Sequence, residues 1–199
     1  MAISLHEQRL DAVVQQLLAS GATSVLDLGC GTGELLLRLV AHHQFSNIVG
    51  IDIDEAVLME ARQMLGIGLF DPTGRVTIRH GSFEQTSTDL TGFAAAALVE
   101  TIEHIDPHRL TRVEHAIFGY MQPVLVLVTT PNQDYNPLHG LASHQYRHPD
   151  HRFEWSRKKF REWSQGVAAR NGYQVTFNDI GPYDTVYGSS TQMARFERD

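Results

Sequence analysis

The sequence predicts a doubly wound α/β fold, with a mostly parallel seven-stranded sheet and helices on both faces. Three observations support this prediction. The apolar strand patterns are short and continuous, helical patterns alternate with them, and a glycine-rich turn follows the first strand. Continuous apolar strands are typical of parallel sheets, because helices cover both faces of such sheets. The length of 199 residues suits one domain, so we expect residues 1–199 to form a single domain with one active site.

The first part of the chain contains a βαβ unit. Leucine and valine at helical spacing predict an entry helix over residues 5–19, between Ser4 and Gly21 as its boundaries. The alternating elements that follow are placed at residues 24–28 (strand), 34–43 (helix), 48–52 (strand) and 55–65 (helix). A ligand that binds the glycine turn at 29–33 would lie at the carboxyl end of the first strand.

The second part continues the alternation and ends in two further strands. The predicted strands are residues 75–78, 95–99, 124–128, 173–177 and 192–196. The predicted helices are residues 106–120 and 157–171. The stretch from Pro131 to Glu154 is long, polar and rich in histidine and proline, and an ordered loop of that length is more often functional than not.

Composition excludes several classes of protein. A single cysteine, Cys30, excludes an intrachain disulfide and a multi-cysteine zinc site. No apolar run approaches the roughly 20 residues of a membrane span, and the N-terminal residues lack the pattern of a secretory signal. We therefore expect a cytoplasmic protein with no membrane association.

The net charge of −7 argues against a protein that grips long nucleic acid by electrostatics alone. Basic residues nevertheless cluster between Arg147 and Arg161, and the 11 histidines are counted as neutral. A site that holds only the terminus of a strand needs few phosphate contacts.

The glycine turn carries the first candidate site. Glycines there serve a tight turn, close backbone approach to a ligand, and contact between strand and helix. Asp27 lies inside an apolar strand, where an unpaired carboxylate is costly, so we expect an ammonium group or backbone donors beside it. Asp52, about twenty residues after the turn, is placed to accept the hydroxyls of an adenosine ribose. The alternatives are a solvated acid at the strand end and a nicotinamide-nucleotide site.

The string DLGCGTG, followed by GIDID, resembles the class I methyltransferases over most of the chain. This resemblance implies S-adenosylmethionine as cofactor, with its amino acid portion near Asp27 and the turn and its ribose at Asp52. Ser82 stands where that family contacts adenine, and it departs from the acid often found there. The implied cofactor-binding residues are Asp27, Gly29, Gly31, Gly33, Asp52 and Ser82.

A second candidate site directly follows the strand at 95–99. If the turn there is helical, Glu100, Glu103 and His104 share one face, and two carboxylates converge with an imidazole. Adjacent carboxylates repel each other unless a cation lies between them. The alternative is a solvated acidic helix start, which the helix dipole favours.

The segment 147–155 can deliver another imidazole to the same sheet edge. Two carboxylates and two histidines would hold one divalent ion. Mixed oxygen and nitrogen ligation suits Mn²⁺, Fe²⁺, Co²⁺ or Zn²⁺, while Mg²⁺ is possible through the carboxylates and waters. Taken singly, a loop histidine is more often a surface or capping residue than a ligand.

Three ordered strings, ETIEH, TTPNQDYN and HPDHRFEWSRKKFREW, resemble the HUA-enhancer (Hen-type) family of small-RNA 3′-terminal ribose 2′-O-methyltransferases. The resemblance spans essentially the whole chain, although family members usually carry further domains. It implies a metal-dependent catalytic site at Glu100, Glu103, His104 and His151, where the metal binds both hydroxyls of the terminal ribose. We favour Mn²⁺, with Mg²⁺ or Co²⁺ as alternatives.

The resemblance also implies the substrate and partners. The substrate is an RNA 3′ end with free 2′- and 3′-hydroxyls, because only that end presents both groups. Bacterial relatives work alongside an RNA end-healing and ligating partner and mark repaired RNA ends. The resemblance implies the same role here, with the partner bound through domains absent here. The general base stays open among His104, His151, His148 and bulk solvent.

Several interpretations remain open from the residues alone. The segment 129–132 either shapes the pocket floor or forms a proline turn. Phe153 and Trp155 either stack on the terminal base or belong to the core, and a basic group either meets phosphates or lies exposed. That basic group consists of Arg152, Arg157 and Lys158. The rival functions are a small-molecule diol O-methyltransferase and a non-enzymatic cofactor-binding regulator.

Overall fold

The computed structural model describes residues 4–68, 74–142 and 144–199. Within these residues, one sheet of seven strands has the order β3-β2-β1-β4-β5-β7-β6, and only β7 is antiparallel to its neighbours β5 and β6. The strands are β1 (Ser24–Leu28), β2 (Asn47–Asp52), β3 (Val76–His80), β4 (Ala95–Val99), β5 (Leu125–Pro131), β6 (Gln174–Asp184) and β7 (Gly188–Glu197). The predicted doubly wound, mostly parallel α/β fold is confirmed.

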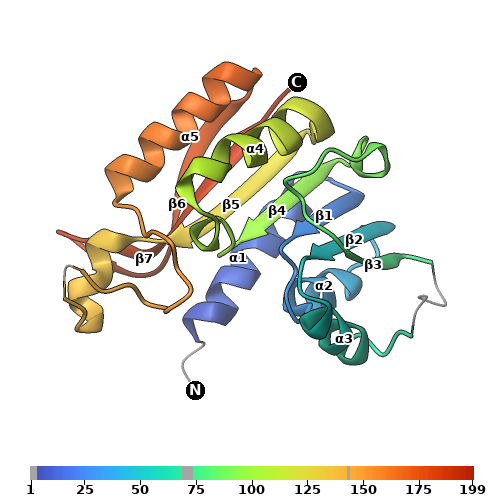
Figure 1. Ribbon diagram of the computed structural model, residues 1–199, viewed down its shortest axis with the longest axis horizontal. Helices are drawn as coiled ribbons and strands as arrows, with labels where there is room; N and C mark the ends of the chain where they lie inside the picture. The colour runs from blue at the N-terminus through green and yellow to red at the C-terminus, as the bar shows by residue number, and fades with distance from the viewer. Residues whose placement is uncertain (1–3, 69–73, 143) are drawn as a thin grey trace.

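Helices cover both faces of the sheet (Figure 1). One face carries α1 (Leu5–Ala19), α2 (Glu34–Val40) and α3 (Glu55–Met64), and the other carries α4 (Leu110–Glu114) and α5 (Arg157–Asn171). Successive residues of a strand point to opposite faces. Val25 therefore packs in the core under α1, α2 and α3, and Leu26 packs in the core under α4 and α5. The central parallel strand β4 is therefore apolar throughout.

Local sequence signals explain where the longest helices begin. Ser4 and Glu7 form a capping box at the start of α1, in which each side chain binds the other residue's backbone amide. Ser156 caps α5 by accepting from the Lys159 amide, and Gly172 ends that helix in the left-handed conformation. Both helices have the predicted bounds.

Other elements differ from the prediction at their ends. Helix α2 stops at Val40 instead of residue 43. The predicted helix at 106–120 consists of a 3₁₀ turn (Pro107–Arg109), α4, and a π-helix (His115–Met121). Strand β5 continues through the polar residues to Pro131, because it pairs with β7 as far as Thr191. Periodicity in one segment does not report such pairing.

The carboxyl ends of the central strands create the place for a ligand. Strand order reverses between β1 and β4, which lie side by side although β2 and β3 separate them in the chain. Ligands of doubly wound folds bind at this crevice. The segment after β5 is ordered there, with a 3₁₀ helix η5 (Gln133–His139) and a bridge between Asn132 and Trp155. None of the helices among the described residues has the length and apolarity that crossing a membrane requires.

Candidate active site

A cavity of about 480 Å³ opens at the carboxyl ends of β1, β2 and β4. Three residues of the predicted cofactor set line it, namely Gly29, Asp52 and Ser82. The full lining is Gly29, Asp52, Ile53, Asp54, Ser82, Phe83, Glu84, Glu100, Thr101, His104, Ile105, Arg109 and Asp150. The cavity therefore joins the glycine turn to the first residues of the predicted metal site.

The turn glycines have different physical roles. Gly29 has a φ of 83°, and a Cβ there would lie 2.5 Å from Thr101 Cγ2. Gly33 packs against α3, because its Cβ would lie 3.0 Å from Ala61 Cβ. Gly31 has open space around it, and its amide donates to Asp52 Oδ2 at 2.9 Å. Only Gly29 of the three lines the cavity; the others shape the turn behind it.

Asp52 is positioned by backbone donors at the end of β2. Its Oδ2 accepts from Gly31, and its Oδ1 accepts from the Asp54 amide at 3.0 Å. Each carboxylate oxygen keeps a further acceptor lone pair. Asp52 is only half-buried and lines the cavity, so its free acceptor capacity is available to a ligand hydroxyl.

Asp27 lies beneath the turn, outside the cavity lining, and its Oδ2 is buried without a hydrogen-bond partner. Burial raises the pKa of Asp27 to about 7, and the nearby Asp52 carboxylate adds to the effect. Among the described residues, no hydrogen-bond donor reaches this atom. An unsatisfied buried carboxylate beneath a glycine turn suits a ligand that carries positive charge, as S-adenosylmethionine does.

The turn after β4 is not the helical face that the spacing suggested. Glu100 has a φ of 50°, and a 3₁₀ helix η2 (Ile102–His104) begins only after Thr101. The Glu100 amide donates to the Thr129 carbonyl at 3.2 Å and to Thr129 Oγ1 at 3.1 Å, which holds this conformation. The tight turn, rather than an α-helix, brings the acidic residues to the sheet edge.

Two carboxylates lie in this turn, of which Glu103 is buried and Glu100 is partly exposed. Glu103 is completely buried; its Oε2 accepts from Thr130 Oγ1 at 3.0 Å, but its Oε1 has no partner. Glu100 pairs with Arg9 of α1 at 3.1 Å, and its Oε1 accepts from Thr129 Oγ1 at 3.2 Å. The carboxylates thus obtain one cation and two hydroxyls, which leaves Glu103 without charge compensation of its own.

The pKa values of both carboxyl groups reflect this shortage. Burial raises the pKa of Glu100, although the Arg9 guanidinium opposes the effect. Burial raises the pKa of Glu103 well above its ordinary value, and the neighbouring Glu100 carboxylate raises it further. Ionising both groups together therefore requires an additional cation.

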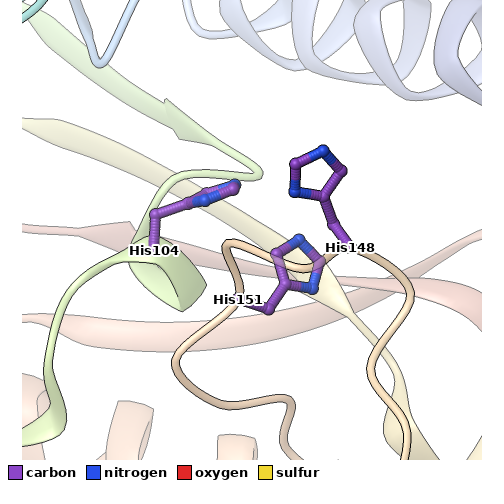
Figure 2. Close-up of side chains that lie close together, drawn as sticks. All are labelled: His104, His148 and His151. Carbon is purple, nitrogen blue, oxygen red and sulfur yellow. The ribbon is translucent and has the colours of Figure 1, made fainter.

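Three histidines gather beside this turn (Figure 2). Each of His104, His148 and His151 offers a nitrogen atom, and these atoms lie within 4.8 Å of one another. His104 comes from η2, whereas the other two come from one loop, as Figure 2 shows. Burial lowers the pKa of His104, and His151 and His148 lower it further, which favours the neutral imidazole that metals bind.

Among the described residues, the group of nitrogens within 4.8 Å of one another includes neither glutamate, but the four predicted metal ligands lie on neighbouring segments of the site. Glu100 lines the main cavity with His104, and it lines a second cavity with His151. The Arg152 amide donates to the Glu103 carbonyl at 2.7 Å, which ties the loop to the turn. Two carboxylates, one with an unpartnered buried oxygen, and neutral imidazoles are a donor set that fits a divalent ion.

The second cavity, of about 390 Å³, lies on the other side of Glu100. It is lined by Leu5, Arg9, Glu100, Pro131, His139, Leu141, Arg147 and His151. Two of these side chains, Arg9 and Arg147, are cationic. The second cavity therefore has two cationic side chains beside Glu100, although the chain as a whole is acidic.

Arg9 went unnoticed in the sequence, and Thr129 and Thr130 were considered only as part of the segment 129–132, which had two possible roles. The fully buried Thr129 and Thr130 support the two glutamates, and Arg9 arrives from a helix about ninety residues earlier. Polar residues at the end of a parallel strand were a usable signal for the threonines. No local signal distinguishes Arg9 from an exposed helical arginine.

The aromatic residues of the loop belong to the core. Phe153 is 5% exposed and stacks on Trp155 with ring centroids 4.3 Å apart. Trp155 also packs against Trp163 of α5. Of the two interpretations left open, the structure favours core packing for Phe153.

Comparison with known proteins agrees with the fold. The family model described as a methyltransferase domain matches residues 25–123. The methyltransferase domain of bacterial CtHen1-CN is 38% identical, with a TM-score of 0.89 over 98% of this chain and 100% of that one. The small RNA methyltransferase HEN1 is 28% identical, with a TM-score of 0.89 over 100% of this chain and 27% of that one.

The fold, the glycine turn and these matches define a class I S-adenosylmethionine-dependent methyltransferase. Within that class, the chain belongs to the Hen1 family of methyltransferase domains. A small RNA 2′-O-methyltransferase of Mus musculus is 36% identical over 183 residues, which cover 89% of this chain and 46% of the relative. One of Xenopus tropicalis is 33% identical, over 98% of this chain and 55% of the relative. The chain thus spans about half the length of these curated relatives.

Proposed function

We propose that this domain transfers a methyl group from S-adenosylmethionine to the 2′-hydroxyl of the 3′-terminal ribose of an RNA, and that the reaction depends on a divalent ion. One observation carries the proposal. At the end of the cofactor cavity, the buried Glu103 has an unpartnered oxygen beside Glu100 and a group of three histidines. This donor set suits a cation that can hold a vicinal diol.

The residues divide the work between two sides of the site. S-adenosylmethionine would supply the methyl group. Glu100, Glu103, His104 and His151 would hold a divalent ion, which would supply Lewis-acid activation of the hydroxyl. Asp52 accepts hydrogen bonds from the cofactor ribose at the opposite end of the cavity. Thr129 and Thr130 keep the glutamates oriented toward their ligand, so little reorganisation is needed during the reaction.

The second cavity supports RNA as the acceptor. A terminal ribose bound at Glu100 carries its phosphodiester a few ångströms away, and the anion needs a positive neighbour. Arg9 and Arg147 line the second cavity with one carboxylate, Glu100. The cofactor cavity has five carboxylates and one arginine, Arg109. This difference in charge supports an RNA chain that extends on the side of the second cavity.

The relatives support the same substrate class, because those of Mus musculus and Xenopus tropicalis are named small RNA 2′-O-methyltransferases. We treat residues 1–199 as one methyltransferase domain. We also propose that it acts on repaired RNA ends together with an end-healing and ligating protein. A chain in the Pnkp1/Rnl/Hen1 RNA repair complex has the same fold at 19% identity, with a TM-score of 0.73.

The test measures transfer of labelled methyl from S-adenosylmethionine to a short RNA. The reaction is run with Mn²⁺ and with a chelator, and matched RNAs carry either a 2′-deoxy or a 3′-phosphate terminus. We expect labelling only of the RNA with both hydroxyls free, and only with the metal. Catechol is added in excess as a competitor, and it should not reduce labelling.

Other outcomes would change the assignment. Labelling of the 2′-deoxy RNA would contradict the ribose acceptor. Equal labelling with chelator would contradict the metal. Labelling of catechol in place of every RNA would indicate a small-molecule diol methyltransferase.

A further inference from the structure

A buried carboxylate, Glu154, contacts His151, one of the two loop histidines of Figure 2. Its Oε1 lies 2.6 Å from His151 Nδ1. The same oxygen accepts from the Arg147 amide at 2.6 Å, and Oε2 accepts from Asn136 Nδ2 at 2.6 Å. Two of these three contacts are with N–H groups that can only donate.

The side chain of Glu154 is completely buried. The Arg147 amide donates to Oε1 and Asn136 Nδ2 donates to Oε2, so both oxygens act as hydrogen-bond acceptors. A carboxylate whose two oxygens both accept is complemented by an N–H group at its third contact. The hydrogen of that contact is therefore assigned to His151 Nδ1.

The carboxylate itself is fixed by the strands beneath it. Arg147 Nε donates to Asn136 Oδ1 at 2.7 Å, and the same guanidinium donates to the Asn132 carbonyl at 2.7 Å. It also donates to the Ser190 carbonyl of β7 at 2.9 Å. The loop that carries His151 is thus anchored to the ends of β5 and β7, and the imidazole has little freedom to rotate.

The hydrogen at Nδ1 decides which nitrogen of His151 can bind a ligand. With Nδ1 donating to Glu154, the neutral ring keeps its lone pair on Nε2. His148 differs, because its Nδ1 accepts from the Asp150 amide at 3.2 Å and its side chain is half exposed. The two loop histidines are thus fixed in different ways.

We propose that Glu154 is a positioning residue for His151: it accepts the Nδ1 hydrogen, fixes the ring, and leaves Nε2 free to bind the divalent ion. This inference rests on the proposed metal site. Carboxylates that accept from metal-binding histidines commonly have this function, and their loss lowers metal affinity about 10- to 100-fold. The sequence offered no role for Glu154.

A purely structural role makes a different prediction. If Glu154 only anchors the loop through Arg147 and Asn136, its loss would lower stability. The tautomer of His151 would then not depend on Glu154. Removal of His151 would then leave the effect of Glu154 on metal affinity unchanged. Two measurements separate these possibilities.

The first measurement is the tautomer of His151 in the metal-free protein, by long-range ¹H–¹⁵N NMR of the imidazole ring at a pH where the ring is neutral. We expect the hydrogen on Nδ1 in the unmodified protein and a mixture in Glu154→Gln. A hydrogen on Nε2 in the unmodified protein would overturn the proposal, and this result does not depend on whether a variant folds.

The second measurement is a double-mutant cycle of Mn²⁺ affinity by titration calorimetry. Glu154→Gln should lower the affinity about 10- to 100-fold, whereas in a His151→Ala background it should change the affinity less than about threefold. Glu114→Gln is the matched control, because Glu114 pairs with Arg170 and lines neither of the two cavities. Asn136→Ser, which removes one donor but keeps Glu154, should give a smaller loss.

The outcomes distinguish the inference from the proposed function. If the unmodified domain binds Mn²⁺ and Glu154→Gln binds it equally well, the positioning role is wrong and the metal site stands. Equal effects of Glu154→Gln in both backgrounds would also overturn it. If the unmodified domain binds no Mn²⁺, the proposed metal site and the role toward it both fall.

Discussion

The two ends of the active-site cavity are built in different ways. The cofactor end consists of one contiguous segment, residues 27–33, and one acid, Asp52, and it works largely through backbone conformation. The acceptor end is assembled from side chains of α1, the turn 100–104, β5 and the loop 148–154. A site formed by the backbone of one segment can be recognised as a sequence motif, whereas a site formed by side chains of several distant segments exists only in the folded chain.

The ends also share a property, because each contains a buried carboxylate oxygen without a partner. At the cofactor end this is Asp27 Oδ2, and at the acceptor end it is Glu103 Oε1. Both groups carry raised pKa values, mainly through burial. Such groups lower the stability of the free protein and become useful only when a cation binds.

The largest expected effect tests the acceptor end. Glu103→Gln removes the carboxylate with the unpartnered oxygen, and methyl transfer should fall at least about a thousandfold, or ~4 kcal/mol. S-adenosylmethionine binding should be retained. At pH values above 7, the unfolding temperature of the free domain should stay equal or rise, because a buried charge is removed.

The measurements are initial rates, cofactor titration and thermal unfolding. Glu114→Gln is the control, since Glu114 is paired with Arg170 away from the cavity. A Glu103→Gln enzyme within tenfold of full activity would show that the acceptor end works without this carboxylate.

The second prediction concerns the contact between the two ends. Gly29→Ala combines a left-handed φ of 83° with a Cβ 2.5 Å from Thr101 Cγ2. We expect a loss of roughly 2–5 kcal/mol in unfolding free energy, together with weaker cofactor binding. Gly31→Ala, which has open space, should lose only about 1–2 kcal/mol from backbone strain.

Urea unfolding of both variants checks this difference. Thr101→Ser removes the closest atom and should partly restore Gly29→Ala. Equal losses at Gly29 and Gly31 would mean that the two ends are not in steric contact.

The third prediction is a pH dependence at the cofactor end. The pKa of Asp27 is about 7 in the folded chain and near 3.8 when unfolded, so the folded state binds more protons between these values. Stability from this group is therefore lost as pH rises from about 4 to about 7, by up to a few kcal/mol, and is constant above. Asp27→Asn should remove this contribution.

The measurement is the unfolding free energy of the ligand-free domain at pH 5 and pH 8. The difference between the two values should be smaller in Asp27→Asn than in the unmodified domain. An identical pH dependence in both proteins would place the titration elsewhere.

The smallest expected effect concerns the support of the glutamates. Thr130→Val keeps the shape of the side chain but removes the hydroxyl that donates to Glu103. A hydrogen bond to a charged group contributes about 1.5–3 kcal/mol, so methyl transfer should fall roughly tenfold or more. Thr111→Val on the exposed side of α4 is the control. Equal rates for these two variants would show that the Thr130 hydroxyl does not contribute to methyl transfer.

Much of the fold was predictable because its signals are local. Helices α1 and α5 begin at serine caps, and β1 and β4 are apolar runs of the predicted length. The errors fall where long-range pairing overrides local pattern. Thr129 and Thr130 looked like residues beyond a strand, but their pairing with β7 keeps them inside β5 and buries them.

The acceptor site shows the same limit more sharply. Spacing suggested that Glu100, Glu103 and His104 share a helical face, but Glu100 is left-handed and only the last two lie in η2. Side chains still converge, because the Thr129 contacts fix the turn from a neighbouring strand. The resemblance of the motifs, rather than helix geometry, pointed to these residues.

The amino-acid sequence alone determined the α/β class, the glycine turn and the acid of the second strand, since short-range apolar periodicity and backbone conformation encode them. Only the tertiary structure decided that Arg9 pairs with Glu100, that Glu103 keeps an unpartnered oxygen, and that Glu154 holds His151. These are contacts between segments that lie far apart in the sequence. Burial increases both the free energy gained from a charge partner and the cost of lacking one, because water no longer screens the charges.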